Sequence, residues 1–257
     1  MLVTRGHAQL HVQAFGQGPV TLLALGGWTA PGLVWHDLFS HLPHWRCVSL
    51  DHRGTGLTLS ETASIDVDTM ADDLLAVVEA LRPARCVLAA ESSGAAPALR
   101  AALKAPGRFD SLVLAGAAWK PMPQAAFDAT SARLRADHDG FVRAFAEACL
   151  PEAPALHRWG HALLRASSPD AAVALMRCRV GLEWGDELRR LALPALLLHG
   201  SRDAIVPPAH SRELAALLPR ATVVELPGLG HAPMITAPAE LARRIEQQVC
   251  ALELCRG

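Results

Sequence analysis

The residue types around position 92 are those needed to build a nucleophilic serine. A continuous apolar stretch, typical of a buried strand, ends two residues before Ser92, which has Ala90 two positions before it and Gly94 two positions after it. Small side chains there fit a sharp strand-to-helix turn, where larger ones would collide with the neighbouring strand or helix. Ser93 would have the bulky Glu91 in the earlier position, so Ser92 is the predicted nucleophile. The alternative is an ordinary serine N-cap.

A serine hydroxyl needs a base to take its proton before it can attack a carbonyl group. His231 is the predicted base, because it lies in a glycine-bracketed loop between the last expected strand and the last helix. A carboxylate must orient that base, and Asp203 follows the penultimate strand, whereas residues 116–119, after the preceding strand, contain no acid. The alternatives are a surface-loop histidine and a turn or N-cap aspartate. His199, at the end of the same strand, is interpreted as a packing residue rather than as a second base.

Two backbone N–H groups are predicted to stabilise the negative charge that develops on a substrate oxygen. The N–H of Ser93 would head a helix and benefit from the positive end of that helix. The second donor is assigned to Trp28, in the glycine-containing loop 25–32 that follows the first buried strand. The ring of Trp28 is also a candidate wall of the substrate pocket. The alternative for this loop is an ordinary turn at the end of a strand.

No cofactor and no metal are predicted. Residues 51–56 leave a strand and contain two glycines, but they lack the complete glycine-rich pattern of a nucleotide-binding loop. Asp51 and Arg53 are therefore predicted to tie loops together beside the loop that carries Trp28. The histidines show no pair at i and i+4 with a nearby acid on a convincing helix, which is the spacing typical of a metal site.

These side chains need a scaffold that brings loops from different strands to one edge. Residues 9–15 alternate between apolar and polar side chains, which predicts a half-exposed antiparallel edge strand. Continuous apolar runs, typical of strands covered on both faces, occupy residues 20–25, 47–50, 86–89, 112–115, 195–198 and 222–226. Amphipathic helical patterns separate these runs. The sequence therefore predicts an α/β fold with a mostly parallel central sheet of about eight strands and helices on both faces.

One interval breaks this alternation. Residues 117–190 contain no convincing strand and several helical patterns, so they are predicted to form a helical cap over the carboxyl edge of the sheet, where ligands bind in such folds. Residues 1–116 and 191–257 would form the core. Besides Trp28, the candidate pocket residues are the large apolar ones of the cap: Trp119, Met122, Phe127, Phe141, Trp159, Met176 and Trp184. The alternative is that most of them pack the cap helices.

Composition narrows the class of protein. The chain has 257 residues, is 51% hydrophobic and carries a net charge of −1 without a basic patch, so nucleic acid is not an expected partner. The sequence has no signal-peptide core and no apolar run near the roughly 18 residues that span a bilayer. We expect a cytoplasmic protein without a membrane partner, either a monomer or a homodimer. Reduced thiols are predicted for the scattered cysteines: Cys47, Cys86, Cys149, Cys178, Cys250 and Cys255.

Five segments together resemble the α/β-hydrolase superfamily, of the serine-nucleophile type with a helical cap. They are residues 25–28, 51–56, 90–94, 199–203 and 230–233, in the order and at the strand ends that the family uses. The resemblance covers nearly the whole chain apart from the cap. Two positions depart from the family pattern, since Gly26 stands where a histidine is usual and Ala90 replaces the first glycine of the serine turn.

The resemblance implies a serine hydrolase that cleaves a small, largely apolar carboxylic ester, thioester or lactone through an acyl-enzyme intermediate. In that reading Ser92, Asp203 and His231 form the catalytic triad, and the N–H groups of Trp28 and Ser93 form the oxyanion hole. A serine nucleophile argues against epoxide or halide chemistry. An acyltransferase with the same triad and a non-catalytic small-ligand receptor on the same fold stay open, as do carbon–carbon and peptide bond cleavage.

Overall fold

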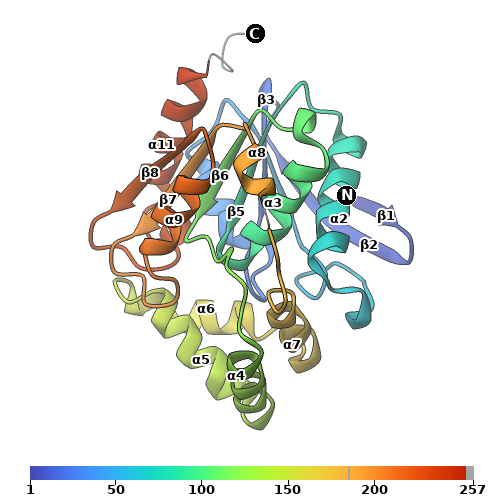
Figure 1. Ribbon diagram of the computed structural model, residues 1–257, viewed down its shortest axis with the longest axis vertical. Helices are drawn as coiled ribbons and strands as arrows, with labels where there is room; N and C mark the ends of the chain where they lie inside the picture. Colours follow the sequence, from blue (N-terminus) through green and yellow to red (C-terminus); the bar gives the residue numbers. More distant parts are fainter. Residues whose placement is uncertain (185, 253–257) are drawn as a thin grey trace.

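The computed structural model describes residues 1–184 and 186–252 and has an eight-stranded sheet at its centre (Figure 1). The strand order is β1-β2-β4-β3-β5-β6-β7-β8. The pairs β1–β2 and β2–β4 are antiparallel, and the remaining pairs are parallel. The strands are β1 (Leu2–Arg5), β2 (Ala8–Phe15), β3 (Val20–Leu25), β4 (Arg46–Leu50), β5 (Arg85–Glu91), β6 (Ser111–Ala115), β7 (Ala195–Gly200) and β8 (Ala221–Leu226). The predicted α/β fold with a mostly parallel sheet is confirmed.

The two outer strands on opposite sides of the sheet differ from expectation. Strand β1 was not predicted, because four residues are too few to show a period, and it pairs only with β2. Strand β8 was expected to be covered on both faces, which is wrong: Thr222 and Glu225 are exposed and only Leu226 is buried. The position of β8 at the sheet edge explains this, since it has a neighbouring strand on one side only.

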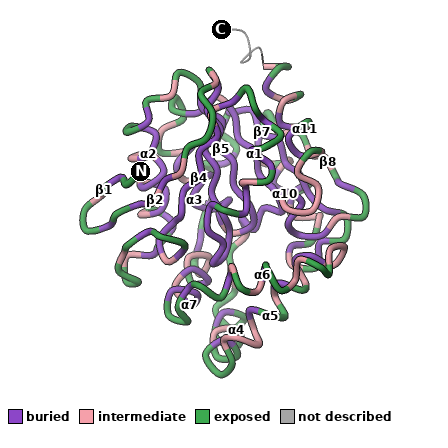
Figure 2. The backbone as a smooth tube through the Cα atoms, turned by 180° about the vertical axis from the view of Figure 1, so that it is seen from behind, coloured by how far each residue is buried: buried purple, intermediate pink, exposed green. Residues whose placement is uncertain are grey.

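Alternate residues of each central strand point to opposite faces and bury two separate cores. Along β3, Leu22 and Ala24 belong to one core, and Leu23 and Leu25 belong to the other. Helices α1 (His36–Ser40), α10 (Pro233–Thr236) and α11 (Pro238–Ala251) cover the first face. Helices α2 (Val67–Leu81), α3 (Ala95–Lys104) and α9 (Ala209–Leu217) cover the second. The central strands are accordingly buried along their length (Figure 2).

In the described residues of the predicted cap interval, 117–184 and 186–190, the structure has five α-helices, one short 3-10 helix (Pro154–Leu156) and no named strand. The α-helices are α4 (Gln124–Ala136), α5 (His138–Cys149), α6 (His157–Leu164), α7 (Pro169–Arg177) and α8 (Glu187–Arg190). Helices α4 to α7 lie together beyond one end of the sheet, whereas α8 lies beside α3 (Figure 1). An ion pair of 3.0 Å between Arg100 and Glu187 joins α3 to α8. The division into core and cap stays a prediction.

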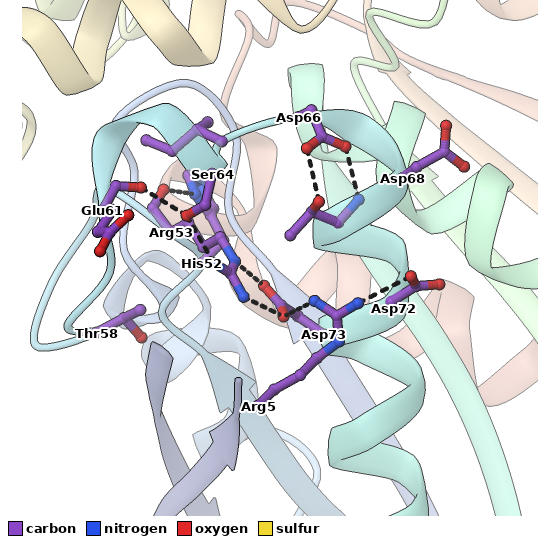
Figure 3. A network of polar contacts seen from close by, with 12 residues as sticks. Arg5, His52, Arg53, Thr58, Glu61, Ser64, Asp66, Asp68, Asp72 and Asp73 are labelled. Carbon is purple, nitrogen blue, oxygen red and sulfur yellow. Dashed lines mark hydrogen bonds and ion pairs between the residues drawn. The ribbon is translucent and has the colours of Figure 1, made fainter. Parts of the chain in front are cut away.

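A polar network fixes the loop after β4 to helix α2 (Figure 3). The Arg53 guanidinium donates to both carboxylate oxygens of Asp73, at 2.6 and 2.9 Å, and both side chains are buried. Arg5 of β1 reaches the same carboxylate at 3.2 Å. Asp51 accepts from the N–H of Gly32 at 2.8 Å, which ties the β4 loop to the loop after β3. The predicted role of Asp51 in joining loops is confirmed, whereas Arg53 joins its loop to helix α2.

Two expectations from composition concern thiols and membranes. Cys47, Cys86, Cys149 and Cys178 carry free thiols, as predicted, and burial raises the pKa of the Cys47, Cys86 and Cys178 thiols to about 12. Cys255 lies outside the described residues. Within residues 1–184 and 186–252, no helix combines the length and apolar character required to cross a membrane.

Candidate active site

The turn at Ser92 is held in a strained conformation from both sides. Ser92 has φ of +50°, in the left-handed region that a residue with a side chain rarely adopts. The N–H of Ala118, in the loop after β6, donates to the Ser92 carbonyl at 2.9 Å. On the other side, a methyl group at Gly94 would lie inside van der Waals contact with the carbonyl oxygen of Gly26. The packing explains why small residues flank the serine.

Folding brings the three predicted side chains into one hydrogen-bonded line. The Ser92 hydroxyl oxygen lies 2.8 Å from Nε2 of His231, and Nδ1 of His231 lies 2.7 Å from Oδ2 of Asp203. The other Asp203 oxygen accepts from the N–H groups of Ile205 and Val206 at 2.8 and 2.9 Å. A carboxylate held in this way accepts a hydrogen bond from Nδ1–H, so the unprotonated Nε2 can accept a hydrogen bond from the Ser92 hydroxyl.

The loop that carries His231 is anchored to the cap. The N–H of His231 donates to the carbonyl of Cys149, the last residue of α5, at 3.0 Å. The preceding residue must be glycine, because a methyl group at Gly230 would lie 2.5 Å from Pro151 and 2.7 Å from Glu152. The close approach of loop and cap buries the imidazole, which is 2% exposed, and removes competing contacts with bulk water.

Neighbouring charges and hydrogen bonds shift the pKa values of both His231 and Asp203. Burial alone would lower the pKa of His231, but the hydrogen bond and charge of Asp203, helped by the charge of Glu91, raise it above the ordinary value. Burial alone would raise the pKa of Asp203, but hydrogen bonds from His199 and His231 outweigh burial and hold it well below its usual range. Asp203 therefore stays ionised and would stabilise an imidazolium at His231 if the imidazole took a proton from Ser92.

His199 contacts the same carboxylate. Its Nε2 atom lies 3.1 Å from Oδ2 of Asp203 and 2.8 Å from the carbonyl of Val206, so this nitrogen carries a proton. Its Nδ1 atom lies 2.7 Å from the Ser211 hydroxyl. His199 is buried at the strand end, as expected of a packing residue, but it also contacts the Asp203 carboxylate, which that interpretation left out. The sequence carried a signal, since a residue at the end of β7 lies four positions before Asp203 on the same strand and loop.

The loop that carries Trp28 is held by two buried side chains. Glu91 accepts from the N–H of Gly27 at 2.6 Å, and Nε2 of His52 lies 2.7 Å from the Gly27 carbonyl. A trans peptide places its C=O and the following N–H on opposite sides, so holding the Gly27 carbonyl also sets the direction of the Trp28 N–H. Trp28 and Ser93 both line the cavity beside Ser92, where the two predicted donors would be needed.

Two cavities meet at Ser92, the predicted nucleophile. We name the smaller one, of about 40 Å³, the His231 cavity, and the larger one, of about 230 Å³, the Arg179 cavity. Ser92, Trp28 and Phe145 line both of them. Phe145 lies edge-on to the Trp28 ring with the ring centroids 4.8 Å apart, and the Trp28 indole N–H donates to the carbonyl of Ala172 in α7 at 2.8 Å. The cap and the core therefore build the two cavities jointly.

The structure separates the predicted pocket residues into two groups. The cavity walls contain five of them: Trp28, Met122, Phe141, Trp159 and Met176. The other three lie elsewhere and pack the chain: Trp119, Phe127 and Trp184. The Trp184 indole donates to the Trp119 carbonyl at 2.8 Å, and the Phe127 ring lies beneath a guanidinium at 4.7 Å. Residue type and helical spacing do not distinguish the two groups, because both are large, apolar and mostly buried.

Three polar residues near the site were not predicted to act there: Glu91, His199 and Arg179. Glu91 lines the His231 cavity, and burial raises the pKa of its carboxyl. Its place next to Ser92 was visible in the sequence, but the direction of its side chain was not. Arg179 lines the larger cavity, and no local pattern marks it among the arginines of the cap. Within the described residues, no group of three or more His, Cys, Asp or Glu side chains could hold a metal ion.

Comparison with known proteins places the chain in a family. A family model for the α/β-hydrolase fold matches residues 20–159 and 157–238. The chain belongs to the α/β-hydrolase family. Over 250 residues this α/β hydrolase is 28% identical to the pimeloyl-[acyl-carrier protein] methyl ester esterase of Nitrosomonas europaea, with 91% of this chain and 96% of the relative covered. It is 31% identical to RutD of Variovorax paradoxus, provisionally named a carbamate hydrolase, with 93% and 94% covered.

Solved structures share the fold of this α/β hydrolase. An esterase from Exiguobacterium antarcticum superposes with a TM-score of 0.91 at 21% identity, covering 97% of this chain and 98% of the other. The enol-lactonase from Burkholderia xenovorans superposes with a TM-score of 0.86 at 18% identity, covering 97% of this chain and all of the other. Fold and family relatives together show that the protein is an α/β-fold hydrolase.

Proposed function

We propose that this hydrolase cleaves carboxylic esters of small alcohols through an acyl-enzyme formed on Ser92. The observation that carries the proposal is the hydrogen-bonded line from Ser92 through His231 to Asp203 at the junction of the two cavities. A hydroxyl, a base and an orienting carboxylate in this order are the parts of acyl transfer by a serine. A relative named as a methyl ester esterase supports the same class of substrate.

The first half of the reaction transfers the acyl group to the enzyme. His231 takes the hydroxyl proton on Nε2 while Oγ of Ser92 bonds to the ester carbonyl carbon, whose oxygen becomes negatively charged. The N–H groups of Trp28 and Ser93 stabilise that oxygen. The bond from the carbonyl carbon to the alkoxy oxygen then breaks, and the proton on Nε2 passes to the leaving alcohol. Water repeats the sequence and releases the acid with Ser92 regenerated.

The place of the leaving alcohol follows from the place of the base. The group that protonates the alkoxide must lie beside it, and of the two cavities only the smaller one is lined by His231. With a volume of about 40 Å³ and apolar walls such as Leu163 and Leu164, this cavity has room for little more than a few water-sized groups. The expected alcohol is therefore methanol or ethanol in size.

Replacement of Ser92 tests the proposal. A series of esters of one acid with methyl, ethyl, butyl and benzyl alcohols is followed by acid release, and the smallest alcohols are expected to be turned over best. Ser92→Ala is expected to remove turnover and labelling by a fluorophosphonate. The matched control is Ser93→Ala, which keeps the backbone N–H and is expected to retain activity. Full turnover by Ser92→Ala would overturn the proposal.

The same assay separates the alternatives. Turnover only in the presence of an added alcohol or amine, with little release of free acid, would indicate an acyltransferase. A native protein that neither turns over esters nor reacts with the fluorophosphonate would indicate a receptor. Thioesters and lactones of the same acid, measured beside the methyl ester, decide which acyl class is preferred.

A further inference from the structure

The larger of the two cavities contains a cation that the hydrolysis itself does not use. Arg179 lies two residues beyond the end of α7 and lines the Arg179 cavity, whose wall also contains Ser92 and Ser93. Its backbone is anchored, since its carbonyl accepts from the N–H of Met122 at 2.8 Å. The side chain is thus attached to a fixed segment at the junction of cap and core.

The guanidinium is only partly satisfied. Nε donates to the carbonyl of Lys120 at 3.0 Å. Throughout the described part of the chain, no carboxylate lies within ion-pair distance of Arg179, whereas other cap arginines such as Arg135 and Arg143 have aspartate partners at 2.8 and 2.7 Å. Burial lowers the pKa of Arg179, which reflects loss of water around the charge. Four of the five guanidinium N–H groups have no protein partner among the described residues.

The surroundings make this charge unusual. Among the described residues that line this cavity, Arg179 is the only one with a charged side chain. Most of the wall is apolar and comes from both the cap and the core: Met122, Phe141, Leu175, Met176, Ile205 and Val206. Arg179 is half-buried, so a cation in this largely apolar wall favours an anionic partner, and a guanidinium matches the two oxygens of a carboxylate.

The proposed place of the leaving alcohol leaves the Arg179 cavity for the acyl part of the substrate. If the leaving alcohol lies beside His231, the acyl chain must extend to the other side of Ser92, along the apolar wall towards Arg179. We infer that the preferred substrates are monoesters of dicarboxylic acids, with the free carboxylate bound by the Arg179 guanidinium. The inference rests on the proposed function for the ester end and on the cavity for the carboxylate end.

A matched pair of esters tests it. Monomethyl esters of dicarboxylic acids from succinate to suberate are compared with the corresponding methyl esters that end in a primary amide instead of the carboxylate. For the best chain length, Arg179→Met is expected to lower kcat/KM for the carboxylate ester about tenfold to a hundredfold, the effect of losing hydrogen bonds to a charged group. The amide ester is expected to change less than about threefold.

Arg177→Met is the control. Arg177 is exposed, belongs to the same segment and lies over the Phe127 ring at 4.7 Å, outside both cavity walls. This variant is expected to leave the ratio of the two kcat/KM values unchanged. Arg179→Lys keeps the charge but loses the planar fork, so it is expected to recover part of the preference. Equal losses for the carboxylate and amide esters in Arg179→Met would overturn the inference.

A binding measurement distinguishes failure of the proposed carboxylate site from failure of the proposed ester hydrolysis. Calorimetry with the Ser92→Ala variant and the monomethyl esters requires no turnover. The carboxylate ester is expected to bind at least tenfold more tightly than the amide ester, and the difference is expected to vanish in Ser92→Ala/Arg179→Met. Absence of ester turnover with this binding difference intact would contradict the proposed hydrolysis alone. Turnover of amide esters without any binding difference would contradict the carboxylate site alone.

Discussion

The Nε2 atom of His199 lies 3.1 Å from Oδ2 of Asp203, the same oxygen that faces Nδ1 of His231 at 2.7 Å. Two imidazoles thus share one carboxylate oxygen, and the protonated Nε2 of His199 donates to it. His199 is itself held by the Ser211 hydroxyl. We interpret His199 as a positioning residue that keeps Asp203 ionised and correctly turned.

Replacing His199 tests this role. His199→Leu is expected to lower kcat about tenfold with little change in KM, because loss of a hydrogen bond to a charged group loosens Asp203. His199→Gln, whose amide N–H can reach the same region, is expected to recover most of the loss. Steady-state kinetics with a methyl ester and thermal unfolding of each variant measure both effects. A uniform loss that tracks the unfolding temperature, without rescue by glutamine, would indicate packing only.

The pH dependence of activity is expected to respond to Glu91. His231 must be neutral to accept a proton, so activity rises with pH through a pKa that Asp203 and Glu91 place above the ordinary value of 6.5. Glu91→Gln removes one of these charges while an oxygen remains for the Gly27 N–H. The acidic limb of the kcat/KM profile is therefore expected to move to lower pH. An unmoved limb would contradict an ionised Glu91 beside the imidazole.

Gly94 is expected to tolerate no side chain. In Gly94→Ala the new methyl group would press on the carbonyl oxygen of Gly26 and push the serine turn away from the loop that carries Trp28. We expect a loss of about 1–3 kcal/mol in unfolding free energy and a larger loss in kcat. The matched control is Gly107→Ala, where nothing lies within 4 Å of the added methyl group. Urea unfolding and ester kinetics measure the two variants side by side.

Replacing one partner of the buried ion pair Arg53–Asp73 is expected to destabilise the fold more than replacing both. Arg53→Met leaves the Asp73 carboxylate buried with only the more distant Arg5 at 3.2 Å, so we expect about 3–5 kcal/mol of destabilisation. Arg53→Met/Asp73→Leu is expected to recover much of this, because no unpaired charge is left. The exposed pair of Arg135 and Asp170 serves as control, and Arg135→Met is expected to cost less than about 1 kcal/mol. Chemical denaturation measures each difference.

Much of the scaffold followed from local pattern. Apolar runs covered on both faces and amphipathic stretches between them predicted the parallel sheet, because burial on two faces leaves a continuous apolar signature. The same pattern did not predict the two edge strands correctly. Strand β1 is too short to show a period, and β8 was expected to be buried although its side chains are largely exposed. A local pattern reflects the residues of one strand. Whether that strand lies at the centre or at the edge of the sheet depends on how all the strands pair.

By itself, the sequence determined that Ser92, Asp203 and His231 follow three different strands, and parallel strands deliver such loops to one edge. The structure places the three in hydrogen-bond contact, while their catalytic roles stay predictions. Only the tertiary structure decided which residues surround them. Arg179 meets the same cavity as Ser92, and Trp184 does not, because the cap helices pack through non-local contacts that no short segment of sequence encodes.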